Sequence, residues 1–218
     1  AEVKGAVARV RKAVKVPLGI HCHNDCNLAV ANSIAAAEEG CTLVQGTING
    51  YGERSGNANL TSIIPVLQIK LKKRCLSDAK LKELTEMSHY VAEICNMPME
   101  TNQPFTGRSA FAHKGGVHID AVQKNVKTYE HMDPEEVGNR RRFLSSELGG
   151  RANLLAKARE LNTDLKKDSP ETRRILEEVQ KLENEGYLFE AAEASFQLLI
   201  QRALGREKKF FKVESAMV

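Results

Sequence analysis

The strongest constraint on the fold is an alternation of helical and fully apolar segments near the start of the chain. An amphipathic helix is predicted over residues 2–14, where valines recur at helical spacing, and a helix of small residues over 28–39. The short apolar segments PLGIHCH and CTLVQGTI follow these helices and are predicted to be buried strands, and LTSIIPVLQIKL is predicted to be a third helix. Helices that alternate with apolar strands indicate a parallel sheet, as in a (β/α)8 barrel or a doubly wound fold.

Two strands cannot close either of these folds, so we expect the rest of the sheet to come from sequence before residue 1. The segment AEVKGAVARVRKAV is helix-like from its first residue, and KKFFKVESAMV resembles the beginning of a strand. Both ends therefore suggest a segment of a longer protein. For the second helix, Asp25 or Asn27 is the expected N-cap and Gly40 the expected C-terminal stop.

The rest of the chain is predicted to be mostly helical. Apolar residues at helical spacing predict a helix over 77–95 and a short one over 117–125. Three further helices are predicted between Ala152 and Leu204, separated at Pro170 and Gly186. The stretch TYEHMDPEEVGN is polar and is expected to be irregular.

Charge and cysteine content narrow the class of protein. The net charge is +4, charges of both signs are mixed along the chain, and no basic block interleaves with aromatic residues, so a nucleic-acid partner is not favoured. The short cluster 140–142 is expected on a solvated face, although an anionic ligand would also suit it. Five cysteines without a CxxC pair indicate reduced thiols in the cytoplasm, and no apolar run approaches a membrane span.

Two histidines stand one residue apart at the end of the first predicted strand. Side chains alternate across a strand, so His21 and His23 are expected on one side and Cys22 on the other. In barrels and open α/β sheets, active sites form at the carboxyl ends of the strands. Two imidazoles at that edge make half of a metal site, although two structural histidines in a loop remain the alternative.

The loop after the second predicted strand, NGYGERSGNAN, offers a partner for these histidines. Neighbouring parallel strands would bring it beside them, and the Asn57 carbonyl is a suitable hard-oxygen ligand. Glu53 and Arg54 are expected to form an ion pair that orders the loop around Asn57. The alternative is a polar surface loop whose glycines serve its turns.

The motifs HCHND and VQGTINGYGERSGNANL together resemble the acyltransferase family of 2-isopropylmalate, homocitrate and citramalate synthases, in a superfamily with hydroxymethylglutaryl-CoA lyase. FAHKGGVHIDAV, TYEHMDPEEVGN and ENEGYLFEAAEASF look most like the citramalate synthase branch. The resemblance implies an α/β fold that is the C-terminal part of a (β/α)8 TIM barrel followed by a mostly helical linker region. Residues 1–74 would be the last βα units, 75–205 the linker subdomains, and 206–218 the start of a C-terminal regulatory domain.

The resemblance also implies roles for individual residues. His21 and His23 match the two metal histidines, and Asn57 matches an asparagine at or near the metal. His118 matches a linker histidine that reaches the active site of the neighbouring subunit in a homodimer, and Tyr129 matches a tyrosine of the hydrolytic step. A metal-binding aspartate and a catalytic glutamate would lie upstream of residue 1. Without the family, His118 would be a helix-start histidine and Tyr129 a packing residue.

The implied reaction condenses acetyl-CoA with pyruvate and hydrolyses the thioester to give (R)-citramalate, on a route to isoleucine. The cofactor would be a divalent ion (Mg, Mn or Zn) acting as a Lewis acid, with acetyl-CoA as co-substrate. The nearest alternative is the same chemistry on 2-oxoisovalerate, giving 2-isopropylmalate. A lyase and a non-catalytic dimerisation fragment are two further hypotheses, and this piece alone is expected to be inactive.

The remaining histidines and cations of the linker region have open roles. His113, Lys114 and Arg108 are expected to be polar loop residues, with contacts to CoA phosphates as the alternative. His89 and His131 are expected to be structural or solvent-exposed.

Overall fold

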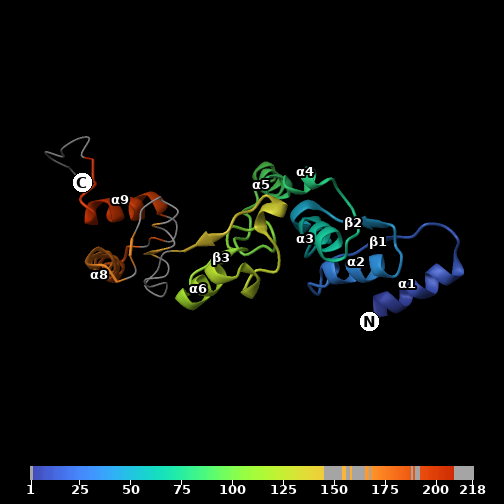
Figure 1. Cartoon of the computed structure of the whole chain (residues 1–218). Helices are drawn as coiled ribbons and strands as arrows, with labels where there is room; N and C mark the ends of the chain where they lie inside the picture. The colour runs from blue at the N-terminus through green and yellow to red at the C-terminus, as the bar shows by residue number, and fades with distance from the viewer. Residues whose placement is uncertain are drawn as a thin grey trace. The chain divides into compact units, whose positions relative to one another are not determined.

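The structure is a computed structural model that describes residues 2–144, 154–155, 158, 165–166, 168–187, 189 and 192–208 (Figure 1). The chain forms two compact units. Unit 1 comprises Ala1–Phe111 and Met132–Arg140, and unit 2 comprises Ala112–His131 and Arg141–Val218. None of the helices in the described residues combines the length and the hydropathy that a membrane span requires.

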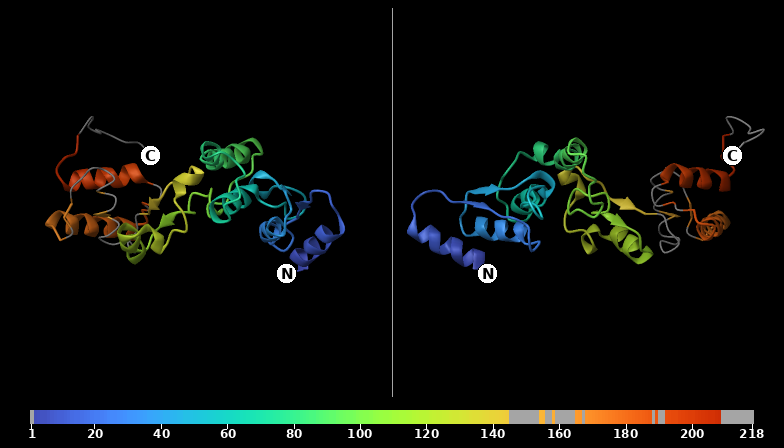
Figure 2. Two further views of the ribbon diagram at one scale, coloured as in Figure 1. Left: turned by 45° about the vertical axis from the view of Figure 1, so that its right-hand side comes forward. Right: turned by 180° about the vertical axis from the view of Figure 1, so that it is seen from behind.

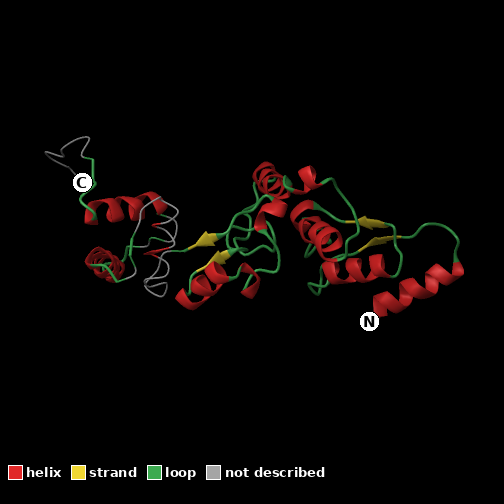
Figure 3. Ribbon diagram, viewed as in Figure 1, coloured by secondary structure: helices red, strands yellow, loops and turns green. Residues whose placement is uncertain are grey.

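Unit 1 begins with the predicted alternation of helices and strands. Its first four elements are α1 (Glu2–Ala13), β1 (Gly19–His21), α2 (Ala29–Glu38) and β2 (Leu43–Gln45). The two strands pair in parallel, with Ile20 opposite Val44 (Figure 3). The predicted parallel α/β arrangement is therefore confirmed for this part of the chain.

Small residues let α2 pack closely in the core of unit 1. Ala29 and Ala37 of this helix are buried in one apolar cluster with Ala58, Ile63 and Leu67. Helix α1 lies beside α2 (Figure 2), and the Arg11 guanidinium joins the two by donating to the carbonyl oxygen of Glu39 at 2.9 Å.

The N-cap expected for α2 was wrong. The side-chain oxygen of Asn24 accepts from the backbone N–H of Ala29 at 3.2 Å, and neither Asp25 nor Asn27 caps the helix. Asn27 has a left-handed backbone (φ 58°) in the turn before the helix, and the Asp25 carboxylate is bound by Arg54. Asp25 and Asn27 therefore belong to the turn that precedes the helix. This turn places the Asn24 side chain beside the first N–H of α2.

The predicted third helix changes its hydrogen-bond pattern halfway. It begins as α3 (Leu60–Pro65), capped by Asn59, whose side chain accepts from the Thr61 N–H at 2.9 Å. It continues as a π-helical segment, η2 (Val66–Lys70). Pro65, the last residue of α3, has no N–H to donate, so one hydrogen bond of the preceding turn is missing where the pattern changes.

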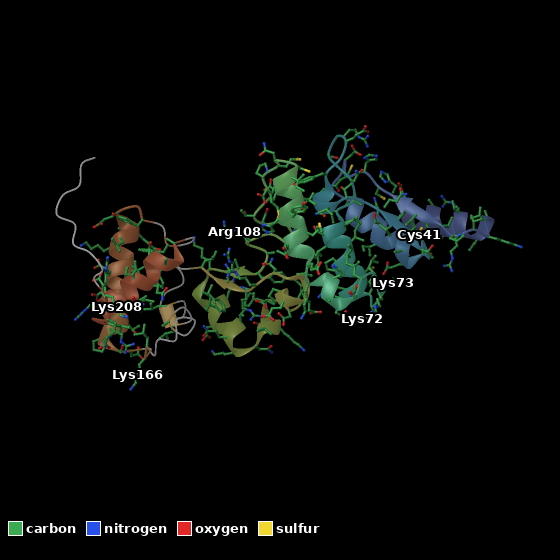
Figure 4. All side chains as sticks on the ribbon, turned by 90° about the horizontal axis from the view of Figure 1, so that it is seen from above. Cys41, Lys72, Lys73, Arg108, Lys166 and Lys208 are labelled. Carbon is green, nitrogen blue, oxygen red and sulfur yellow. The ribbon has the colours of Figure 1, made fainter. Side chains whose placement is uncertain are left out.

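The predicted helix over 77–95 is two helices, α4 (Asp78–Leu81) and α5 (Leu84–Ile94), and the 3-10 turn η4 (Pro134–Val137) packs against them. Leu81, Leu84 and Val137 are buried there in a second apolar cluster with Phe105 and Phe111. Another 3-10 turn, η1 (Ile48–Gly50), follows β2. The Lys73 side chain, labelled in Figure 4, ties the end of η2 to α2 by donating to the Ala37 carbonyl oxygen at 3.3 Å.

Unit 2 contains a short parallel strand pair and the later helices. Its described elements are β3 (Ala112–His113), α6 (Gly116–Lys124), η3 (Val126–Thr128), β4 (Arg142–Phe143), α8 (Pro170–Asn184) and α9 (Glu193–Ala203). The helices predicted around 117–125 and 175–182 are confirmed, whereas the β3–β4 pair was not expected. Apolar side chains of α8 and α9 pack with Leu154 and Phe189 in one core. Most of the first helix predicted after Ala152, and the strand expected after residue 208, lie outside the described residues.

Candidate metal centre

The two histidines of the HCHND motif lie together at the end of β1. Their ring centroids are 5.1 Å apart and their planes are inclined at 76°. His21 is the last residue of β1 and is exposed, and His23 is half-buried. The carboxyl end of this strand therefore presents two imidazoles to one small volume.

The loop after β2 pairs directly with the histidine segment. His23 and Asn57 are partners in an antiparallel bridge, and the Ala58 N–H donates to the Cys22 carbonyl oxygen at 3.0 Å. The Asn24 N–H donates to the Gly56 carbonyl oxygen at 2.9 Å. These backbone bonds place Asn57 next to His23, as the adjacency of parallel strands predicted.

Two polar atoms at this junction are buried and have no hydrogen-bond partner among the described residues. They are His23 Nδ1 and Asn57 Oδ1. The Asn57 amide nitrogen donates to the Tyr51 carbonyl oxygen at 3.2 Å, which leaves its oxygen as a free acceptor. A buried polar atom without a partner costs about 1–3 kcal/mol, so a ligand that satisfies both atoms would stabilise the site.

Imidazole nitrogens and an amide oxygen are a donor set that suits a divalent cation. They do not complete a site by themselves, because no group of three His, Cys, Asp or Glu side chains gathers in the described part of the chain. The donor types of His21, His23 and Asn57 nevertheless fit a divalent metal ion.

Arg54 fastens the loop to the histidine segment. Its guanidinium donates twice to the Asp25 carboxylate, at 2.8 Å and 3.0 Å. The side-chain hydrogen bond from Arg54 lowers the pKa of Asp25 below its ordinary value. The expected Glu53–Arg54 pair was therefore wrong, because the backbone pairing of Asn24 with Gly56 brings Asp25 within reach of Arg54.

Two glycines make the tight course of this loop possible. Gly56 has φ +96°, and a Cβ there would lie 2.2 Å from the Gly50 carbonyl oxygen. A Cβ on Gly52 would lie 2.2 Å from the Asn57 amide nitrogen. A side chain at either position would displace the segment that carries Asn57.

His118 and Tyr129, both in unit 2, lie against each other. The His118 ring on α6 is 4.2 Å from the Tyr129 ring, centroid to centroid, with the planes inclined at 32°. Both side chains are exposed. The structure thus joins the two residues to which the family resemblance gives catalytic roles.

A buried ionic cluster follows Tyr129 directly. The Glu130 carboxylate accepts from Arg141 Nε at 2.6 Å, from Arg141 Nη2 at 2.5 Å and from His113 Nε2 at 3.0 Å. Burial by itself raises the pKa of Glu130, but the hydrogen bonds from Arg141 and His113 outweigh it and lower the pKa. The sequence shows that these residues are ionisable, but no pattern in it predicted that they would meet.

The cluster corrects two expectations. His113 is a buried residue of β3, not a loop residue, because its ring bonds to a carboxylate in the interior. Arg141 is bound to Glu130, so the cluster 140–142 is not simply a solvated face. Lys114 and Arg108 are exposed; Arg108 is labelled in Figure 4.

His89 and His131 are exposed, which agrees with the structural or solvent-exposed role expected for them. The His89 ring nitrogen lies 3.3 Å from the Thr106 carbonyl oxygen.

Comparison with known proteins agrees with the motifs. The family model described as HMGL-like matches residues 1–91, and the model of the homocitrate synthase post-HMGL domain matches residues 105–187. The (R)-citramalate synthase of Geobacter sulfurreducens is 53% identical over 212 residues, which are 97% of this chain and 40% of that protein. The chain belongs to the 2-isopropylmalate and homocitrate synthase family.

Two further relatives match this chain at different sequence identities. The (R)-citramalate synthase of Aquifex aeolicus is 53% identical over 201 residues, covering 92% of this chain and 38% of that protein. A probable 2-isopropylmalate synthase of Methanopyrus kandleri is 37% identical over 185 residues, covering 85% of this chain and 36% of that protein. The chain thus spans about two fifths of the length of these curated relatives.

Proposed function

We propose that this chain is part of an acyltransferase that condenses acetyl-CoA with pyruvate and hydrolyses the thioester, giving (R)-citramalate for isoleucine synthesis. The observation that carries the proposal is the order of the identities. Relatives named (R)-citramalate synthase match at 43–53%, whereas those named 2-isopropylmalate or homocitrate synthase match at 37–39%.

In this proposal the first part of unit 1 contributes the metal-binding end of a TIM barrel. His21 and His23 hold a divalent ion through imidazole nitrogens, and Asn57 lies at the ion through its amide oxygen. The unpartnered atoms His23 Nδ1 and Asn57 Oδ1 support this assignment. Such an ion supplies Lewis acidity toward a 2-oxo acid. Asp25 and Arg54 keep the loop closed on the histidine segment.

His118 and Tyr129 are proposed to act on the substrate in a homodimer, with His118 reaching the active site of the partner subunit. His118 would help to move the methyl proton of acetyl-CoA, and the Tyr129 hydroxyl would orient the water that cleaves the thioester. The contact between their rings and the exposure of both residues support a shared site.

The proposed domain organisation follows the same family. Residues 1–74 are the last βα units of the barrel, 75–205 are helical linker subdomains, and 206–218 begin a regulatory domain. The two family models, which match 1–91 and 105–187, support a change of domain between the barrel and the linker.

Release of CoA tests the proposal in the full-length protein. Purified protein is supplied with acetyl-CoA and either pyruvate or 2-oxoisovalerate, and the free thiol is measured. We expect faster release with pyruvate, and loss of release when a chelator is added. Faster release with 2-oxoisovalerate would assign the protein to 2-isopropylmalate synthesis, and no release with either acid would leave a non-catalytic module.

A further inference from the structure

A buried cluster of polar side chains in unit 1 contacts both ends of the loop that carries Asn57. Its members come from four separate segments: Asn49 of η1, Thr61 of α3, Ser88 of α5, and Gln103 with Thr106 after α5. The side chains of Thr61, Ser88 and Thr106 are completely buried. Nothing in the proposed chemistry uses these residues.

Asn49 is held from two directions. The Ser88 hydroxyl donates to Asn49 Oδ1 at 2.5 Å, and the Asn49 amide returns a hydrogen bond to the Ser88 carbonyl oxygen at 2.8 Å. The Gln103 amide nitrogen also donates to Asn49 Oδ1, at 2.9 Å. These bonds stabilise a left-handed backbone at Asn49 (φ 61°), a conformation that asparagine adopts more readily than most other residues with a side chain.

The Gln103 amide contacts both ends of the loop. Besides Asn49 at its start, the nitrogen lies 3.2 Å from the Thr61 hydroxyl, which follows its end. The Thr61 hydroxyl in turn donates to Asn59 Oδ1 at 2.7 Å. The same nitrogen reaches Thr106 at 2.9 Å, so its two N–H groups are shared among several acceptors.

A backbone hydrogen bond connects these side-chain contacts to Asn57, the candidate metal residue. Gly50, next to Asn49, accepts from the Asn57 N–H at 2.9 Å through its carbonyl oxygen. Asn57 therefore lies between Asn49 and Thr61 in the chain. The Gln103 side chain, which comes from a later segment, hydrogen-bonds to both of these residues. A shift of either anchor would move the Asn57 oxygen relative to His23.

We propose that Gln103 is a positioning residue of the metal centre, which it serves by clamping both ends of the loop that carries Asn57. This inference rests on the proposed metal role of His21, His23 and Asn57. It extends the site into the segment after α5, which contributes no ligand. Residues that hydrogen-bond directly to metal ligands commonly change metal affinity by 10–100-fold when they are replaced. Gln103 acts one step further away, through Asn49 and Thr61, so we expect an effect at the low end of this range.

The test measures Mn²⁺ affinity of the full-length protein, with free Mn²⁺ followed by electron paramagnetic resonance. Gln103→Leu removes the clamp, and we expect the Kd for Mn²⁺ to rise by about 10-fold. Asn49→Gly permits the left-handed backbone but loses the side-chain bonds, so it should weaken binding as well. Thr85→Val is the matched control, because it removes one hydrogen bond of α5, to the Val137 carbonyl oxygen at 2.7 Å, without touching the loop.

The outcomes separate this inference from the proposed function. Wild-type protein that binds no Mn²⁺ overturns both. Wild-type binding with an unchanged Kd in folded Gln103→Leu, or in Asn49→Gly if the first variant does not fold, overturns the clamp and leaves the metal site standing. An equal loss of Mn²⁺ affinity in Thr85→Val would also overturn the clamp, because a general destabilisation of unit 1 would then explain the effect.

Discussion

Replacing Glu130 with glutamine should strongly destabilise unit 2. The glutamate carboxylate is only 3% exposed and accepts three hydrogen bonds, two from Arg141 and one from His113. Glutamine keeps the size of the side chain but loses its charge and one acceptor oxygen. Its NH2 group would face an N–H of the guanidinium or the imidazole, leaving at least one buried donor without a partner.

The size of the effect follows from the burial of the two partners. Breaking a buried ion pair by removing one charge costs about 3–5 kcal/mol. The Arg141 side chain is 30% exposed, so water can take over part of its solvation. We therefore expect Glu130→Gln to lower the free energy of unfolding by about 2–3 kcal/mol at pH 7.

Urea unfolding of the full-length protein, followed by circular dichroism, measures this loss. Lys124→Met is the control, because it removes the exposed Asp120–Lys124 pair of the same unit, a type of pair that contributes about 0.5 kcal/mol or less. A loss for Glu130→Gln no larger than for the control would refute the account of the buried cluster.

The pH dependence gives an independent check on Glu130. Its pKa in the folded protein lies below the ordinary value of 4.5, so its stabilising contribution is complete above that pH. The contribution is lost as the pH falls through the lowered pKa, where the carboxylate is protonated. The stability difference between wild type and Glu130→Gln should therefore shrink below pH 4.5, and a constant difference would contradict the pKa direction.

Three further substitutions test local features by unfolding or metal titration. Asn24→Ala removes the side-chain acceptor for the first N–H of α2 and should cost about 1 kcal/mol in the free energy of unfolding. Gly138→Ala should cost more than about 2 kcal/mol, because φ is +71° and its Cβ would lie 1.9 Å from the Lys82 carbonyl oxygen; Gly186→Ala, also at positive φ but with open space, should cost less. Arg54→Met should weaken Mn²⁺ binding with little change in the urea midpoint, because the Asp25–Arg54 pair is exposed. An unchanged Mn²⁺ affinity would refute its role in holding the loop.

Local periodicity and the order of elements were predictable from the sequence. Apolar spacing found α1, α2, α5, α6 and α8, because each helix follows from residues within a few positions of one another. The period of two in β1 and the adjacency of parallel strands also predicted that His21, His23 and Asn57 would lie together. The assignment of these residues as metal ligands stays a prediction.

Features that depend on distant partners were not predictable. Arg54 pairs with Asp25, 29 residues away, and not with its neighbour Glu53, because the backbone pairing of the two segments decides which carboxylate is near. His113 and Arg141 meet Glu130 only after two short strands have paired. The π-helical segment after Pro65 depends on how the last turns of that helix pack, which periodicity does not report.

Mn²⁺ titration of the double variant His21→Ala/His23→Ala, in the full-length protein, tests the central claim most directly. His131→Ala is the matched control, since it removes an exposed histidine of unit 2 that lies outside the candidate site. The account predicts that wild type and His131→Ala bind Mn²⁺ equally well and that the double variant loses binding while remaining folded. Equal Mn²⁺ affinity in all three proteins would contradict it.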